Sequence, residues 1–182
     1  MPNRTTEELA AGLSEIREAP TDDGELRLVV RRPAEDEREV VHEGELDIET
    51  GLLGDDWLSR GNPRTEDGRA HPLAQLTIMN SRVLDLIAGP IENWPAAGDQ
   101  LYVDLDLSHD NLPPGTRLAI GDSVVEVTDK PHTGCAKFVR RFGLDAHRWV
   151  NSELGSNLKL RGVNAKVVEP GKIRTGDRVK KV

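Results

Sequence analysis

The stretch that predicts the fold most directly is Leu112-Pro113-Pro114-Gly115-Thr116-Arg117-Leu118-Ala119-Ile120-Gly121-Asp122-Ser123-Val124-Val125-Glu126-Val127. One apolar run ends at Ile120, the pair Gly121-Asp122 follows, and a second run begins after Ser123. A Gly-Asp pair between two short apolar runs is typical of a tight turn, so this stretch predicts a β-hairpin. Gly176-Asp177 repeats the turn near the C-terminus.

Further short runs with strand character lie on both sides of this hairpin. Residues 101–107 alternate apolar and polar side chains, which is the pattern of a half-buried strand. Many short strands at close spacing predict a mainly β fold, a β-barrel-like domain that closes its own edges and carries a few short peripheral helices. The other predicted strands are residues 26–30, 40–41, 73–79, 158–161 and 163–168, with a turn over residues 44–51 and a bulge or bend at Gly162.

Helices are predicted at four places. The first begins with a capping box, in which Thr5 is the N-cap and Glu8 its partner, and its apolar residues fall on one stripe. The other helices are predicted at residues 81–88, 136–142 and 144–152. Because the first helix precedes all the strands, we expect an N-terminal helical extension over residues 1–24 and one β-barrel domain over residues 25–182.

Composition limits the class of protein. The 182 residues are 36% hydrophobic and 31% charged, as in an ordinary globular chain, and the formal net charge of -8 argues against non-specific nucleic-acid binding. The sequence has no run of about 18 apolar residues and no apolar segment typical of a signal peptide, so no membrane association is expected. A single cysteine cannot form an internal disulfide, and a cytoplasmic location is expected.

The candidate reactive residue is that cysteine, Cys135. It follows a Pro-x-x-Gly turn that starts at Pro131 and stands at the start of the predicted helix 136–142, where free backbone N–H groups favour a negative charge. His132 precedes it, and basic residues follow within two turns. A cysteine in such a setting has a lowered pKa and reacts as a thiolate. The alternative is a buried cysteine that acts only as a small hydrophobic side chain.

Other chemistries lack a motif. A Cys–His hydrolase needs a base near the thiol and a residue that orients the base, and His132 has no identifiable orienting partner, although His109 or His147 could approach in space. The five histidines lack the spacing that places two zinc ligands on one helical face. A redox-sensing thiol, which would form a reversible sulfenic acid, is a further alternative.

Four segments together resemble a known family, the stand-alone MOSC domains, named after the C-terminal domain of molybdenum cofactor sulfurases. The resemblance extends from about Glu25 to the C-terminus, and it lies in the order of these segments around one cysteine. The segments are Gly51-Leu52-Leu53-Gly54-Asp55, residues 112–121, His132-Thr133-Gly134-Cys135-Ala136-Lys137-Phe138, and residues 162–168 with Gly176-Asp177.

The resemblance implies a β-barrel-like fold with a pocket for a pterin-type molybdenum cofactor at Cys135. In the family this cysteine either carries sulfur as a persulfide or binds molybdenum in members that reduce N-hydroxylated compounds. A cysteine desulfurase or a redox partner is therefore expected beside a small-molecule substrate, and pyridoxal phosphate is not assigned. We assign Cys135 and His132 to catalysis, Cys135 to the metal, and, from charge, capping or motif position, these residues to the cofactor: Lys137, Thr133, Asn80, Arg82 and Asp55.

The sequence departs from the family pattern at two places. Asp56 follows Gly54-Asp55 where many relatives carry a basic residue, and Gly98-Asp99-Gln100-Leu101 replaces a Gly-Glu-Asn-Leu-like phrase. Both changes remove groups that would attract a phosphate. Three arginines are candidates to compensate: Arg117, Arg161 and Arg174. The departures also favour a second reading, a non-catalytic binding module that keeps the fold.

Overall fold

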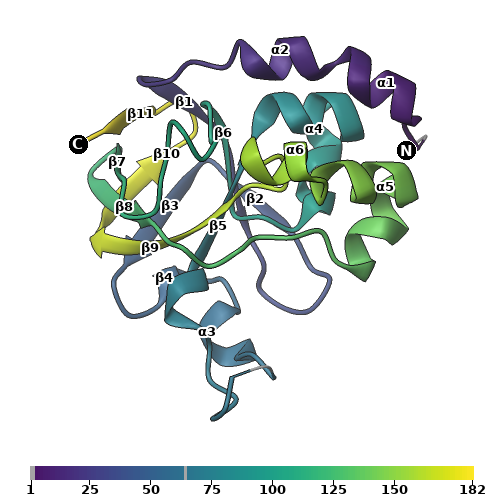
Figure 1. The fold of residues 1–182 in the computed structure, drawn as a ribbon. Coiled ribbons are helices and arrows are strands. Elements are labelled where there is room, and N and C mark those ends of the chain that lie inside the picture. Colours follow the sequence, from purple (N-terminus) through teal and green to yellow (C-terminus); the bar gives the residue numbers. More distant parts are fainter. Residues whose placement is uncertain (1–2, 64) are drawn as a thin grey trace.

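The computed structural model describes residues 3–63 and 65–182, and its strands form a closed barrel with helices packed mainly on one side (Figure 1). The strands are β1 (Gly24–Arg31), β2 (Glu39–Val41), β3 (Glu43–Asp47), β4 (Gly51–Leu52), β5 (Leu76–Asn80), β6 (Leu101–Asp104), β7 (Arg117–Ile120), β8 (Ser123–Val127), β9 (Val163–Glu169), β10 (Gly171–Arg174) and β11 (Arg178–Lys181). The helices are α1 (Thr6–Ala11), α2 (Leu13–Arg17), α3 (Trp57–Arg60), α4 (Ser81–Ala88), α5 (Ala136–Val150) and α6 (Glu153–Asn157), with 3-10 turns η1 (Pro72–Ala74) and η2 (Ile91–Ala97).

The barrel is a ring of hydrogen-bonded strands in the order β11-β7-β8-β9-β5-β6-β1, closed by a second pairing of β11 with β1. All pairings in the ring are antiparallel except that of β5 with β6. The closing contact pairs Gly24 with Val179 and Glu25 with Arg178. Further along the same edge, β1 pairs with β2, and a smaller sheet of β10, β3 and β4 stands beside the barrel. The predicted mainly β, barrel-like fold is confirmed.

Two hydrophobic cores lie on the two sides of the barrel wall. In β6, Leu101 and Val103 belong to the core of strand residues, whereas Tyr102 between them faces the helices. This alternation follows from the two-residue period of a strand. The second core is formed with Leu9 of α1, Leu84 of α4 and the phenylalanines of α5. The helices therefore cover one outer face of the barrel.

The helices confirm some local predictions and refine others. The capping box at Thr5 and Glu8 is present, but the predicted first helix is divided at Gly12 into α1 and α2. A Cβ at Gly12 would lie 2.6 Å from Leu86 Cδ1 of α4, so a larger residue would require the Leu86 side chain to move. In α5, Gly143 has a φ of 87°, which bends the element between the two helices predicted there.

Some local predictions were wrong. Residues 158–161 form a turn instead of a strand, because Leu158 ends α6 and Lys159 takes a positive φ of 51°. The predicted turn over residues 44–51 contains strand β3, in which Gly44 lies against Leu52. None of the helices in the described ranges is long and apolar enough to cross a membrane.

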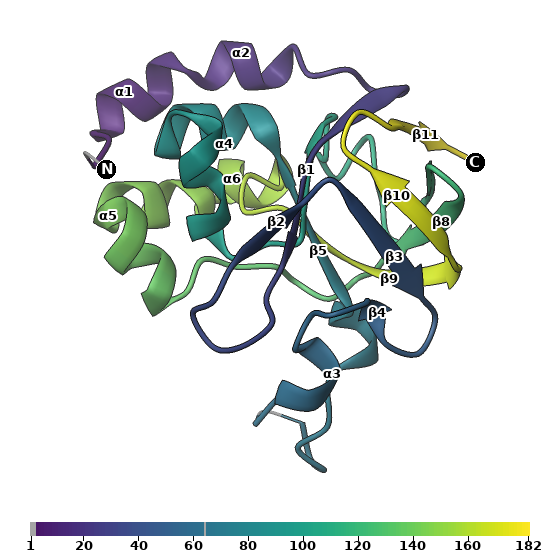
Figure 2. The same ribbon diagram turned by 180° about the vertical axis from the view of Figure 1, so that it is seen from behind.

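α3 and the loop after it lie at the end of the barrel away from α1 and α2, as both ribbon views show (Figures 1 and 2). The connection from β8 to α5 passes along the barrel between these two ends (Figure 1). This connection carries Cys135.

Candidate functional site

The loop between β8 and α5 is held from both sides. Asn164 of β9 donates from Nδ2 to the carbonyl oxygens of Lys130 (3.0 Å) and Pro131 (3.3 Å). At the other end, Gly134 donates its N–H to Asn151 Oδ1 (2.9 Å), and its carbonyl oxygen lies 3.0 Å from His147 Nε2. A Cβ at Gly134 would lie 3.0 Å from Asn151 Nδ2, so glycine fits this contact best. Cys135 is therefore presented by a fixed loop.

Cys135 is the N-cap residue of α5, and its side chain is exposed. Its carbonyl oxygen accepts the N–H of Val139 and so begins the helix. Partial burial alone would raise the pKa of the Cys135 thiol, but the backbone N–H groups of Phe138 and Lys137 and the charge of Arg161 lower this pKa below its ordinary value. The structure thus gives Cys135 the two properties of a reactive thiol, access and a lowered pKa.

Arg161 and Asp99 form a buried ion pair behind the start of α5. Arg161 Nη1 lies 2.7 Å and 3.0 Å from the two Asp99 carboxylate oxygens, and Nη2 donates to the Ala97 carbonyl (3.2 Å). The guanidinium also lies 5.1 Å from the ring centroid of Phe138, in the first turn of α5. Of the three arginines considered from sequence, Arg161 is the one whose charge lowers the pKa of Cys135, whereas Arg117 pairs with Glu126 and Arg174 pairs with Glu43.

His132 lies beside this ion pair. Its Nε2 is 3.5 Å from Asp99 Oδ1, and its Nδ1 is buried without a hydrogen-bond partner in the part of the chain that is described. Burial, followed by the charges of Arg161 and Arg32, lowers the pKa of His132 well below its ordinary value. The imidazole is therefore neutral at physiological pH, so it supplies no positive charge to stabilise the thiolate.

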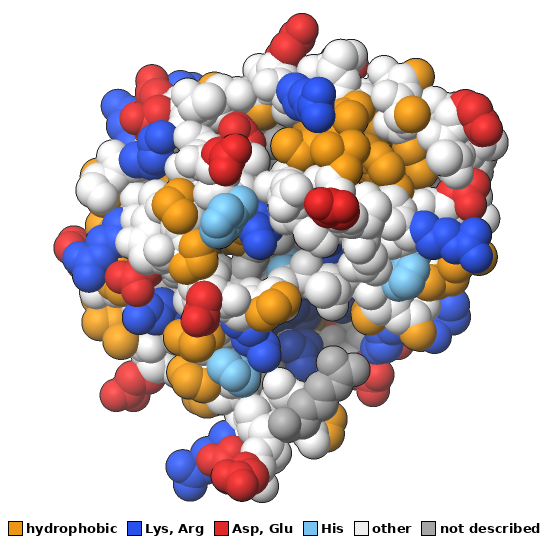
Figure 3. All heavy atoms as spheres, viewed as in Figure 1, with side chains coloured by type: hydrophobic (Ala, Val, Ile, Leu, Met, Phe, Trp, Pro, Cys, Tyr) orange, Lys and Arg blue, Asp and Glu red, His pale blue; other side chains and the backbone are white. Residues whose placement is uncertain are grey.

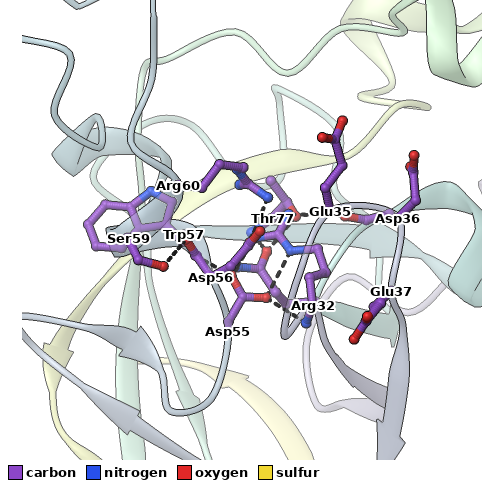
Figure 4. Close-up of polar contacts among 12 residues, drawn as sticks. Arg32, Glu35, Asp36, Glu37, Asp55, Asp56, Trp57, Ser59, Arg60 and Thr77 are labelled. Carbon is purple, nitrogen blue, oxygen red and sulfur yellow. Dashed lines mark hydrogen bonds and ion pairs between the residues drawn. The ribbon is translucent and has the colours of Figure 1, made fainter.

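A second pair of opposite charges stands where β1 ends. Arg32 makes a bidentate contact with Asp55, at 2.8 Å from Nε and 2.8 Å from Nη2, and Asp56 Oδ1 lies 2.7 Å from Arg60 Nη1. Figure 4 shows the Arg32 and Asp55 side chains facing each other with the Asp56–Arg60 pair beside them. Asp55 thus holds Arg32 in place, and Asp56 neutralises part of the charge of Arg60.

A cleft of about 300 Å³ opens beside these pairs. Figure 3 shows the hollowed face, with Lys and Arg side chains inside the hollow. Cys135 is not part of the cleft lining; Asn164 connects the two, because it lines the cleft and also holds the loop that leads to Cys135. The residues lining the cleft include Arg32, Trp57, Arg60, His71, Thr77 and Asn164.

The side chains assigned to a cofactor from sequence are distributed over several places. The ammonium of Lys137 pairs with Glu35 (2.9 Å) and Asp36 (3.0 Å), so it is the backbone N–H of Lys137 that acts on the thiol. Thr133 is exposed on the loop beside Cys135.

Asn80 and Arg82 have structural partners at the start of α4. Asn80 Oδ1 accepts the N–H of Arg82, and Asn80 Nδ2 donates to the Leu105 carbonyl. Arg82 Nε donates to Asp104 (2.7 Å), and its Nη1 donates to the Glu15 carbonyl. Arg82 lines a separate cavity of about 420 Å³ below α1 and α2. Their ligand-binding role stays a prediction from sequence.

Sequence reasoning did not find the parts of the site that come together only in the fold. Asn164 and the Asp99–Arg161 pair are separated from Cys135 by 26 residues or more in the sequence. The one signal for Asp99 was its departure from the family phrase. The structure explains this acid, because its carboxylate is buried against Arg161 and is not a surface charge that would repel a phosphate. In the described residues, no group of three or more His, Cys, Asp or Glu side chains is placed to hold a metal ion.

Comparison with known proteins decides the family. A family model described as the MOSC domain matches residues 67–180. The chain belongs to the MOSC family. The matched range begins after β4, whereas the MOSC barrel of this chain also needs β1, which closes the ring.

Solved structures share the MOSC fold at low sequence identity. The YuaD protein from Bacillus subtilis is 16% identical with a TM-score of 0.61, over 86% of this chain and 93% of that chain. YiiM from Escherichia coli is 21% identical with a TM-score of 0.54, over 87% of this chain and 69% of that one. A hypothetical protein of known structure is 22% identical with a TM-score of 0.59, over 88% and 68%. No curated protein matches the sequence.

Proposed function

We propose that this MOSC protein carries a sulfur atom on Cys135 as a persulfide. The observation that supports the proposal is an exposed thiol, the single one in the chain, whose pKa is lowered at the start of α5. A sulfur carrier needs a sulfur that a donor protein can reach and that is ionised when the donor arrives. The exposed position also argues against the alternative in which Cys135 is only a packing residue.

The transfer step is an exchange between sulfur atoms. The Cys135 thiolate attacks the outer sulfur of a donor persulfide, R–S–SH, such as one formed on a cysteine desulfurase. The S–S bond of the donor breaks, a new S–S bond forms on Cys135, and the donor leaves as the thiolate R–S⁻. Charge and atoms balance, and no external oxidant is needed. The N–H groups of Phe138 and Lys137 hold the negative charge on Cys135 before the attack.

The second candidate function uses Cys135 as the protein ligand of molybdenum in a pterin-type cofactor. Two observations favour it. His132 Nδ1 and Arg161 Nε are buried without hydrogen-bond partners among the described residues, and the cleft of about 300 Å³ is lined by the guanidinium groups of Arg32 and Arg60. This volume is at the lower end of known ligand pockets. Donor groups and cations fit an anionic ligand.

In this second candidate, Cys135 would bind the metal, and Arg60 would help to hold the pterin. When bound, the cofactor supplies the electron-transfer chemistry. The chain itself contributes a thiolate held by a rigid loop, and a neutral His132 that stands beside Asp99. Reduction of N-hydroxylated compounds is the reaction class that this candidate would serve.

Two measurements test these candidates. After incubation with a cysteine desulfurase and L-cysteine, mass spectrometry should find one added sulfur atom on Cys135, and Cys135→Ser should remain unmodified. Metal analysis of protein from a host that makes the cofactor should find molybdenum in the second case, with a loss in Cys135→Ala. Lys172→Ala, on β10, is the matched control and should behave as wild type in both assays. Absence of both sulfur and molybdenum would reject both candidates, and reversible sulfenic acid alone would favour a redox-sensing thiol.

A further inference from the structure

Two basic side chains in the first part of α5, the helix that Cys135 caps, already hold a carboxylate. Asp36 Oδ1 lies 3.0 Å from Lys137 Nζ and 3.0 Å from Arg141 Nη2, and Glu35 Oε1 lies 2.9 Å from the same Lys137 Nζ. Lys137 and Arg141 are four residues apart on the first part of α5, so they stand one above the other on the same helical face. One oxygen of Asp36 therefore sits between two cations, as an oxygen of a bound anion would.

A third cation, Arg38, stands beside this pair. A Cβ at Gly98 would lie 3.3 Å from Arg38 Nη2 and 3.5 Å from Arg141 Nη1, so both guanidinium groups reach the same glycine. Burial, together with the charges of Arg141 and Arg32, lowers the pKa of Arg38. Arg38 Nη1 donates to the Glu37 carbonyl, and Arg38 Nε is buried without a hydrogen-bond partner among the described residues. In that part of the chain no carboxylate is hydrogen-bonded to Arg38.

The carboxylates that now occupy the site are weakly held. Asp36 and Glu35 belong to the loop between β1 and β2, and their side chains are 60% and 79% exposed. Ion pairs between exposed groups contribute little, because water and salt screen them. Figure 4 shows Glu35 and Asp36 pointing away from the Arg32–Asp55 pair, and Glu37 pointing in another direction. A ligand with two or three oxygens can satisfy the same donors.

We propose that Lys137, Arg141 and Arg38 form an anion-binding site at the start of α5, the helix that Cys135 caps, in which Asp36 and Glu35 are resident groups that an incoming phosphate or carboxylate replaces. The substrate class at Cys135 is thus a small molecule that carries an oxyanion. The proposal rests on the proposed function in one respect, since it takes Cys135 as the reacting atom. It adds the site that orients the ligand and the loop that competes with it.

The charge dependence of Cys135 reactivity tests the site. Ellman's reagent is an anionic disulfide and 2,2′-dithiodipyridine is a neutral one, and the chain has a single thiol to react with either. The measured quantity is the ratio of the two rates at pH 7. In the double variant Glu35→Gln/Asp36→Asn this ratio should rise about three- to tenfold, because two negative charges leave and three cations remain. Lys137→Gln should lower the ratio.

Glu43→Gln is the matched control. Glu43 also bridges two cations, Lys172 and Arg174, but on the small sheet of β3 and β10. Its removal should leave the ratio unchanged. An equal rise in Glu43→Gln would mean that net charge alone sets the rate, and it would overturn the proposal.

Added anions identify the ligand chemistry. Inorganic phosphate and succinate are compared with sodium chloride at the same ionic strength, with the anionic reagent as the probe. Inhibition by phosphate alone assigns a phosphate group, inhibition by succinate alone assigns a carboxylate, and inhibition should begin at lower concentrations in the double variant. No inhibition beyond that of sodium chloride, together with an unchanged ratio in the double variant, would refute the anion site. Failure of Cys135 to react with either reagent would instead refute the proposed thiolate.

Discussion

Removing one partner of the Asp99–Arg161 ion pair should destabilise the protein strongly. Asp99 is fully buried, and both of its carboxylate oxygens contact Arg161 Nη1. In Asp99→Asn the Arg161 guanidinium keeps its hydrogen bond to the Ala97 carbonyl but loses its counter-ion inside the protein. An uncompensated buried charge of this kind costs about 3–5 kcal/mol. This is a large part of the total stability of about 5–15 kcal/mol that is usual for a domain.

The assay is urea unfolding followed by circular dichroism. With a slope of about 2 kcal/mol per M, the midpoint should fall by about 1.5–2.5 M, and the melting temperature by about 6–20 °C. Arg161→Met should also destabilise, and more at pH 8 than at pH 5. Burial raises the pKa of Asp99, so without Arg161 the folded state binds a proton more tightly than the unfolded state, and stability falls as pH rises.

The double variant Asp99→Asn/Arg161→Met separates stability from reactivity. It leaves no buried charge at this position, so its loss of unfolding free energy should be smaller than the sum of the losses in the two single variants. The Cys135 thiol should titrate at higher pH in Arg161→Met and in the double variant, because the charge of Arg161 lowers its pKa. Single variants that lose less than about 1 kcal/mol, or losses that simply add, would refute this account of the pair.

Three further predictions concern single residues. The reaction rate of Cys135 with a neutral disulfide should reach half its maximum below the free-thiol pKa of about 8.5, and an ordinary profile would contradict the lowered pKa. Stability should fall as the pH decreases below about 6.5, because the imidazole of His132 binds a proton in the unfolded state that it does not bind in the folded state. His132 should contribute at most about 1.4 kcal/mol per pH unit to this fall. In urea titrations His132→Gln should flatten the dependence of stability on pH, and an unchanged slope would argue against a neutral, buried His132. Gly162→Ala should lower the free energy of unfolding by about 3 kcal/mol or more, because φ is 98° and the added Cβ would lie 2.2 Å from the Ile78 carbonyl oxygen. Gly176→Ala, with a φ of 97° and no atom within 4 Å of the added Cβ, should lower it by about 1–3 kcal/mol from backbone strain alone. Equal losses of stability in the two variants would show that the contact with Ile78 has no effect.

The parts of the fold that sequence predicted well are those that depend on near neighbours. The hairpin of β7 and β8 is present because its turn residues and its paired strands are adjacent in the chain. The capping box of α1 is likewise local. The strand predicted at residues 158–161 failed because alternating side chains in a short run do not determine φ, and Lys159 takes a left-handed conformation. No periodic sequence pattern predicted the 3-10 turn η2 around Trp94 and Pro95.

The same distinction applies to the site. The position of Cys135 at a helix start followed from Pro131, Gly134 and the residues after them, and the structure has it there. The partners of the charged residues did not follow. Lys137 pairs with Glu35 and Asp36, about one hundred residues away in the sequence. Arg161, in the turn before β9, contacts the ring of Phe138 in α5. Such pairings are set by how the barrel closes, which a single sequence does not encode in any short pattern.

The seam between β1 and β11 has a consequence for how the chain folds during synthesis. Two residue pairs close the ring, and the acids Asp22 and Asp23 reach across it to the backbone of Lys181 and the side chain of Arg178. Strand β1 must therefore wait until β11, which is synthesised much later, has left the ribosome before the ring can close. Until then β1 and β7 each have an open edge, and the nascent protein is most exposed to aggregation in that interval.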